Sequence, residues 1–216
     1  MKSPRNLTDL PFADELHEAD GDLELEGYYD RVLFDGSSFA DADAGGARFM
    51  ESALTGVTFD GGRLRRARLS DVWLSETRLV GSDVAESSWT DVWFNGCVLA
   101  GVQAFSGVLR RVTFRGCKLD SVNLREAALT DVVFDNCLLR DVDFTGATLT
   151  RTAFPGCRLT GATFVKASLD TVDLRGAELG ITADPGSLRG MVVTPAQFAA
   201  MSGLLATTLG ITVEDK

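Results

Sequence analysis

The sequence predicts an all-β fold, in which the chain winds into a four-sided coil of short parallel strands and then ends in one short helix. The first observation is a period of five. An apolar residue recurs at every fifth position from Tyr29 to Leu179 without a slip of phase, and 26 of these 31 positions are Leu or Phe. This period fits neither a helix, which repeats at about 3.6 residues, nor a flat strand, which repeats at about 2. It requires a chain that turns after every fifth residue.

The second observation is a period of 20. The four cysteines follow it, at Cys97, Cys117, Cys137 and Cys157. Four groups of five therefore make one turn, and residues 20 apart lie above one another. Parallel rungs are about 4.8 Å apart. The series Asp91, Arg111, Asp131 and Arg151 should then form a ladder of neighbouring opposite charges.

Within each group of five, the residue two places before the apolar centre is small, and we expect both side chains to point inward. The cysteines occupy this small position. Four thiols placed one per coil cannot converge on a single tetrahedral metal ion, so interior packing is the favoured interpretation. Glycines are frequent two places after the centre, as at Gly36, Gly81 and Gly116, where they suit a tight corner.

The small–polar–Leu/Phe–x–x pattern resembles the pentapeptide-repeat proteins, whose loose consensus is Ala-Asp/Asn-Leu-x-x. The resemblance covers residues 30–180 and implies a right-handed quadrilateral parallel β-helix. About 7.5 coils at about 4.8 Å each give a rod of about 36 Å. Because such a rod contacts itself only between neighbouring coils, both of its ends need caps. The repeat is uninterrupted, as in the loop-free members of actinobacteria, so drug protection that depends on loops is not implied.

Three segments are expected: an acidic N-terminal cap or arm (1–28), the β-helix (29–180) and a C-terminal cap (181–216) that contains a helix over 195–209. Thr194 and Gln197 form a capping box with Pro195 at the first helical position, and Gly210 is a natural stop. The apolar stripe of this helix either covers the last coil or pairs with a second copy. The stripe consists of Phe198, Met201, Leu204, Leu205 and Leu209. The resemblance implies a homodimer through this region, as in gyrase-binding members.

Composition argues against an enzyme and against a membrane protein. The only histidine is His17, so any triad or acid–base pair that needs histidine would have to use that residue. The sequence has no phosphate-binding or dinucleotide-binding glycine motif. No run approaches the roughly 20 apolar residues that span a bilayer, and the first 18 residues lack a hydrophobic signal core. We therefore expect a cytoplasmic, non-enzymatic binding protein with no cofactor or metal, and with no direct binding to nucleic acid or membrane.

The resemblance implies one named function. Several pentapeptide-repeat proteins mimic duplex DNA and occupy the DNA site of a type II topoisomerase, DNA gyrase, which they modulate or protect from poisons. The net charge of −10 fits this function, but residues 30–180 hold 20 acids against 17 bases, a net charge of only −3. The sequence therefore allows DNA mimicry without requiring it. The acidic candidates are Asp41, Asp43, Glu51, Asp71, Asp83, Glu86 and Asp91.

The alternative is a scaffold or adaptor for an unknown protein. The position just before each centre should face away from the coil, and Trp73 and Trp93 occupy it on adjacent rungs. They form either a docking surface or the seat of a covering arm, and residues 1–28 could supply that arm. A basic cluster offers a second docking surface; it consists of Arg63, Arg65, Arg66 and Arg68. Ice binding is least favoured, because the column of Thr130 and Thr150 is flanked by charged residues.

Overall fold

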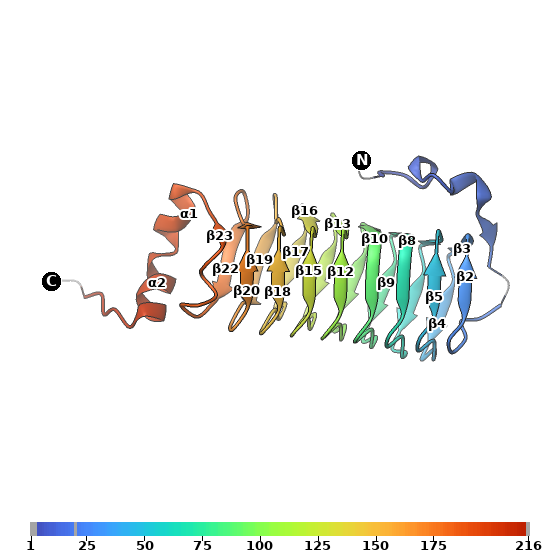
Figure 1. Cartoon of the computed structure of the whole chain (residues 1–216), viewed down its shortest axis with the longest axis horizontal. Helices are drawn as coiled ribbons and strands as arrows, with labels where there is room; N and C mark the ends of the chain where they lie inside the picture. Colours follow the sequence, from blue (N-terminus) through green and yellow to red (C-terminus); the bar gives the residue numbers. More distant parts are fainter. Residues whose placement is uncertain (1–3, 20, 215–216) are drawn as a thin grey trace.

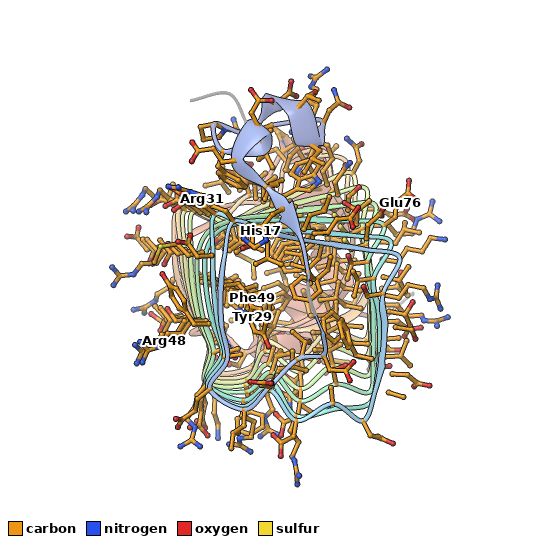
Figure 2. The ribbon with its side chains drawn as sticks, turned by 90° about the vertical axis from the view of Figure 1, so that its right-hand side faces the viewer. His17, Tyr29, Arg31, Arg48, Phe49 and Glu76 are labelled. Atoms are coloured by element: carbon orange, nitrogen blue, oxygen red, sulfur yellow. The ribbon has the colours of Figure 1, made fainter. Side chains whose placement is uncertain are left out.

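The computed structural model describes residues 4–19 and 21–214, and they form a rod of stacked four-sided coils with a helical cap at its C-terminal end (Figure 1). The fold is the predicted parallel-strand β-solenoid, with about eight turns. Each side of the coil is named here as a face, numbered in chain order. Seen from the N-terminal end, the coils superpose as nested rectangles, with Tyr29 and Phe49 pointing inward and Arg48 outward (Figure 2).

Faces 1 and 2 share one sheet of strands. Face 1 contains β2 (Tyr28–Asp30), β5 (Arg48–Met50), the first halves of β8 (Arg68–Ser75) and β10 (Ser88–Asn95), β12 (Val108–Arg110), β15 (Ala128–Thr130), β18 (Thr148–Thr150) and β20 (Ser168–Asp170). Face 2 contains β1 (His17–Glu18), β3 (Val32–Asp35), β6 (Ala53–Thr55), the second halves of β8 and β10, β13 (Thr113–Arg115) and β16 (Val133–Asp135), and it ends with the pair β21 (Val172–Asp173) and β23 (Met191–Val192).

Face 3 is a separate sheet. It contains β4 (Ser38–Ala40), β7 (Thr58–Asp60), β9 (Arg78–Val80), β11 (Val98–Ala100), β14 (Lys118–Asp120), β17 (Leu138–Arg140), β19 (Arg158–Thr163) and β22 (Glu178–Thr182). Along most of face 4 the coils are joined by single bridges, which run from Asp43 to Thr163 in steps of 20, and β19 and β22 pair at its C-terminal end. Every strand pair is parallel, and Trp73 lies beside Trp93 as the period of 20 predicts. The register shifts once, between β19 and β22, where the repeat ends.

The interior is filled by the two inward positions of each group of five. Phe114, Phe134 and Phe154 are at most 2% exposed. With Phe94 they form a continuous stack, with ring centroids 4.5, 4.8 and 4.9 Å apart and planes within 14° of parallel. Phe114 and Phe134 therefore bury both ring surfaces against identical neighbours, so the coil spacing and the aromatic spacing agree.

The corners explain why the chain turns every five residues. Each fifth residue from Glu26 to Gly176 has φ between +47° and +80°, the left-handed region. This conformation turns the chain from one side of the coil to the next within one residue, and glycine adopts it without a Cβ clash. Non-glycine residues occupy many of the corners nonetheless, including the β-branched Thr171 at φ +56°. Those corners carry backbone strain that the stacking of the coils must offset.

The N-terminal segment has two parts. Residues 17–19 and 21–27 form a partial coil on the end of the rod, where His17 N–H donates to Arg31 O at 2.9 Å and Leu23 is buried in the core. Residues 4–16 turn back along face 2 and contain two 3₁₀ helices, η1 (Leu7–Asp9) and η2 (Ala13–Glu15). We call residues 4–16 the arm. Figure 1 shows it above the strands, running from the end of the rod toward its middle.

The C-terminal cap contains two short helices, α1 (Pro195–Ala200) and α2 (Ser202–Leu209), in place of the single helix expected over 195–209. Met201 has ψ of 2° and divides them, and Gly203, a poor helix former, follows the break. The capping box of Thr194 and Gln197 is present, and Gly210 ends α2 in the left-handed conformation. Gln197 Nε2 also donates to Leu174 O and Ala177 O, which closes the last coil.

The corner conformation makes a prediction about stability. Changing Thr171 to Gly should raise the free energy of unfolding by about 1 kcal/mol, because it removes a β-branched side chain from a left-handed residue. The matched variant is Gly116→Ala, at φ +60°, where an added Cβ would meet no atom within 4 Å. It should lower stability by a similar amount through the backbone alone. Urea denaturation checks both, and a neutral Gly116→Ala would contradict the corner assignment.

Candidate interaction surfaces

The carboxylate candidates at the corner between faces 1 and 2 are mostly paired with arginines 20 residues away. Arg31 Nε lies 2.7 Å from Glu51 Oε2, and Arg111 Nη2 lies 2.5 Å from Asp91 Oδ2. Arg151 Nε lies 2.6 Å from Asp131 Oδ1, and its hydrogen bonds lower the pKa of Asp131. The predicted ladder of alternating charge is therefore present as separate ion pairs.

Asp71 is the exception in this column. It stands on the rung between Glu51 and Asp91, and among the described residues no basic side chain forms an ion pair with it. Partial burial raises its pKa, the charge of Asp91 raises it further, and the hydroxyl of Ser70 donates to it at 3.3 Å. Two like charges on adjacent rungs are unfavourable in a sheet. The negative charge of Asp71 is therefore unfavourable in the folded rod.

The remaining acidic candidates lie on face 4 and its corners. Asp43 pairs with Arg63 at 2.9 Å. Arg65 pairs with Asp83 at 3.5 Å and also with Glu86. Asp41 is exposed at the corner between faces 3 and 4, and no ion pair involves it among the residues that the structure describes. Most of the predicted acidic surface is thus neutralised by the coil register itself.

Trp73 is covered rather than exposed. Its side chain points away from the coil as predicted, but it is only 2% exposed, because Leu10 and Phe12 of the arm pack on it together with Ala53. Trp93 is half-buried at the edge of the same cluster. The sequence left two interpretations open, and the structure supports the one in which residues of the arm cover Trp73.

The arm is also fastened by polar contacts at both of its ends. Arg31 Nη1 lies 2.8 Å from Glu15 Oε2, and Arg115 Nη1 donates to Pro4 O at 3.3 Å. Asp14 of the arm and Glu18 of β1 are both exposed, so this side of the rod carries acidic side chains from both segments. Figure 2 shows the arm across one side of the rod, between the corners marked by Arg31 and Glu76.

The cysteines have the interior role that the sequence predicts. All four are at most 3% exposed. Each thiol lies within hydrogen-bond distance of a carbonyl oxygen 23 residues earlier, as Cys157 Sγ does with Phe134 O at 3.0 Å. The hydroxyl of Ser87 makes the same contact with Leu64 O at 3.2 Å. The neighbouring thiol of Cys117 and burial both raise the pKa of Cys97, which disfavours the reactive thiolate.

The apolar stripe of the C-terminal cap is divided between two roles. Met201 is buried at 8% exposure, and with Leu204 it lines a groove against Leu179 and Ile181 of the last coil. Leu205 is half-buried. Phe198 and Leu209 are about 60% exposed, and the chain beyond adds further exposed apolar side chains, Ile211 and Val213. The stripe therefore covers the coil with one side and faces solvent with the other.

Comparison with known families agrees with the repeat geometry. A model of the pentapeptide repeat region matches residues 87–164, and a model of eight pentapeptide repeats matches residues 33–71. The chain is a pentapeptide-repeat protein. Proteins of this family are generally structural or binding proteins. No curated protein matches the sequence.

Solved structures with the same architecture are distant in sequence. HetL, a pentapeptide repeat protein involved in heterocyst differentiation regulation from the cyanobacterium Nostoc, is 19% identical with a TM-score of 0.50, over 78% of this chain and 90% of HetL. Trypsin-treated QnrB1, a plasmid-mediated fluoroquinolone resistance protein, is 22% identical with a TM-score of 0.43, over 92% of this chain and 95% of QnrB1. The likeness to HetL establishes the fold and nothing finer. Among the described residues, no helix of this pentapeptide-repeat protein is long and apolar enough to cross a membrane.

Sequence reasoning missed which face the arm covers, and it missed the cluster of Tyr28, Arg48 and Met50. The ion pairs were readable, because Arg and Asp or Glu recur 20 residues apart at Asp43 and Arg63 and again at Asp120 and Arg140. The arm was signalled by its apolar residues, but nothing in its spacing says which face it covers. Tyr28, Arg48 and Met50 were not singled out, because none of them carries a sequence signal of its own. Only the strand register places them on neighbouring strands.

The unpaired carboxylate predicts an unusual pH response. Asp71→Asn should raise the free energy of unfolding at pH 7 by about 0.5 kcal/mol, the order of one like-charge contact across a sheet. Because the folded-state pKa of Asp71 is raised, the folded state loses stability as pH rises from the ordinary value of 3.8 through the higher folded value. The gain from Asn should therefore vanish below about pH 4, near the ordinary aspartate pKa.

The matched variant for this measurement is Asp131→Asn. Its lowered pKa means that Asp131 stabilises the fold above the ordinary value of 3.8, and that this stabilisation is lost as pH falls through the folded value. The variant should therefore be less stable than the parent at pH 7. Urea denaturation at pH 3 and pH 7 compares the two. If Asp71→Asn were destabilising at pH 7, the unpaired assignment would be wrong.

Proposed function

We propose that the protein is a cytoplasmic, non-enzymatic binding protein that engages a protein partner along its rod, and that DNA gyrase is the partner to test first. Membership of the pentapeptide-repeat family supports the binding role. The observation that carries the gyrase proposal is the position of the arm, since its carboxylates lie on the same side of the rod as the corner column of Glu51, Asp71 and Asp91. Face 2 with its arm is thus the candidate mimic of a DNA surface.

The charge density of the rod limits how closely this side can mimic DNA. Residues 1–29 contain eight acids and two bases, whereas residues 30–180 contain 20 acids and 17 bases. The net charge of −9 over about 36 Å of rod is about one charge per 4 Å, compared with one per about 1.7 Å in duplex DNA. Residues 1–29 supply six of these nine charges. Binding to a DNA site should therefore be electrostatic, weaker than that of DNA itself and sensitive to salt.

The test is gyrase-catalysed supercoiling with increasing protein, with and without a fluoroquinolone. Inhibition at low micromolar protein, or relief of drug-trapped cleavage, is the expected result. Asp14→Asn with Glu18→Gln should raise the half-inhibitory concentration severalfold, because these changes remove charge from the arm side. The matched control removes the same charge from faces 3 and 4, with Asp60→Asn and Asp141→Asn, and should act like the parent. No effect on gyrases from several bacteria would reject gyrase as the partner.

We further propose that the protein is a homodimer through its C-terminal region. The exposed Phe198 and Leu209 form the solvent-facing side of the cap, and a two-fold axis would let this patch pair with itself. Burying these side chains in a dimer would remove their apolar surface from water. A dimer would also lengthen the rod and present the arm side twice.

Light scattering after size exclusion tests the dimer. The 23.2 kDa chain should give twice that mass, and Phe198→Asp should return it to the mass of one chain. The matched control is Leu25→Asp, at a residue that is 66% exposed at the opposite end, and this variant should stay dimeric. A parent protein with the mass of one chain at tens of micromolar would reject the proposal.

A further inference from the structure

A small patch on face 1, near the N-terminal end, departs from the charge pattern of the rest of the rod. It is formed by Tyr28, Arg48, Met50, Arg66 and Arg68, and all five side chains are exposed. We call it the arginine patch. We infer that it is a docking site for an acidic segment of another protein, a surface distinct from the acidic side proposed for gyrase.

The first argument is the absence of internal partners. Most arginines of the coils pair with a carboxylate one rung away, as Arg63 does with Asp43 and Arg140 with Asp120. Among the described residues, no ion pair involves Arg48, Arg66 or Arg68. The structure also divides the basic cluster seen in the sequence, because Arg63 and Arg65 are neutralised on face 4. What remains is a concentrated positive charge in a chain whose net charge is −10.

The second argument is the register. Arg48 lies directly beside Arg68 on the neighbouring strand, and Tyr28 lies beside Arg48 on the other side. Like charges directly opposite one another destabilise a sheet. The register places opposite charges together at many other positions, as at Arg111 and Asp91, so this pair departs from the commoner pattern, as the column of Glu51, Asp71 and Asp91 does. Such departures are expected where a surface serves a partner, because a bound carboxylate would relieve the repulsion.

The third argument is the type of residue that lies beside the arginines. Tyr28 is 59% exposed and Met50 is 42% exposed, and the Tyr28 hydroxyl lies 3.8 Å from the Met50 sulfur. Aromatic residues, Met and Arg are the types enriched in protein–protein interfaces, and Tyr and Arg dominate binding hot spots. The two apolar side chains can receive an aliphatic or aromatic residue of the partner while the guanidinium groups bind its carboxylates.

The surroundings favour an acidic protein segment over a nucleic acid. Carboxylates ring the patch at the corners of the same coils and on face 1, and these are Glu26, Asp30, Glu51, Asp71 and Glu86. They would repel a phosphate backbone that continued past the arginines, and the overall charge opposes polyanions at longer range. A short acidic segment needs only the patch itself. Its length is limited to the few residues that three guanidinium groups on adjacent coils can reach.

The experiment measures binding of a fluorescein-labelled peptide, Glu-Glu-Leu-Asp-Glu-Phe-Asp-Glu, by fluorescence anisotropy. The parent protein should bind it, and the dissociation constant should rise at least threefold between 50 and 300 mM salt. Arg48→Glu with Arg68→Glu should weaken binding at least tenfold. The matched control is Arg78→Glu, at an exposed arginine of face 3 that also has no ion pair among the described residues, and it should change the affinity less than twofold.

Further measurements distinguish this proposal from other outcomes. The same peptide with Gln and Asn in place of its acids should bind at least tenfold more weakly. Thermal melting should show the charge-reversed protein folded, and Arg48→Gln with Arg68→Gln replaces it if it is not. No binding by the parent, equal binding by the double variant, or tighter binding to a 12-base-pair DNA duplex than to the peptide would each overturn the proposal. None of these results depends on gyrase.

Discussion

The structure depends on one conformational constraint, a left-handed residue at every fifth position. Its cost is about 1 kcal/mol or more at each corner that is not glycine. The cost is offset because most corner amides donate to a carbonyl of the next coil, as Asp131 N–H does to Thr150 O at 3.0 Å and Gly96 N–H to Arg115 O at 2.9 Å. Since the corners never slip, the coils have equal length. Equal coils stack identical positions, and this gives the aromatic column and the line of thiols their regularity.

The same stacking governs the electrostatics of the surface. A charge on one coil is always about 4.8 Å from its counterpart 20 residues away, so the sequence can neutralise its own surface by placing opposite charges at that separation. Arg111 with Asp91, and Arg151 with Asp131, show that it does so. Individually these exposed pairs contribute little stability. Their larger effect is to keep the rod nearly neutral, so that unpaired charges, among them Asp71 and the arginine patch, stand out locally.

Most of the fold could be predicted from the sequence because the repeat leaves few alternatives. The period of five fixes which side chains point inward, and Phe134 and Cys137 lie in the interior as expected. The ends were harder to predict. The orientation of Trp73 was predicted correctly, but the sequence left open whether an arm covers it, because a side chain that points away from the coil can still be buried under another segment. The arm has no period, so its position depends on tertiary packing with Leu10 and Phe12. The break at Met201 is likewise local, since capping signals mark the ends of a helix but not an interruption within it.

The faces of this regular rod thus differ because of the arm and of a few residues that depart from the charge pattern of the repeats. The arm makes face 2 acidic without changing any coil, and it covers an indole that would otherwise face solvent. On the adjacent face 1, Arg48 and Arg68 lie side by side, whereas many other arginines of the coils lie beside a carboxylate. Because the stacked coils hold these surfaces at fixed positions on one rod, a partner bound to one face would be held in a defined orientation to a partner on the other. A basic partner would select face 2 and an acidic one face 1, so the sign of the charge sorts the partners before any close contact forms.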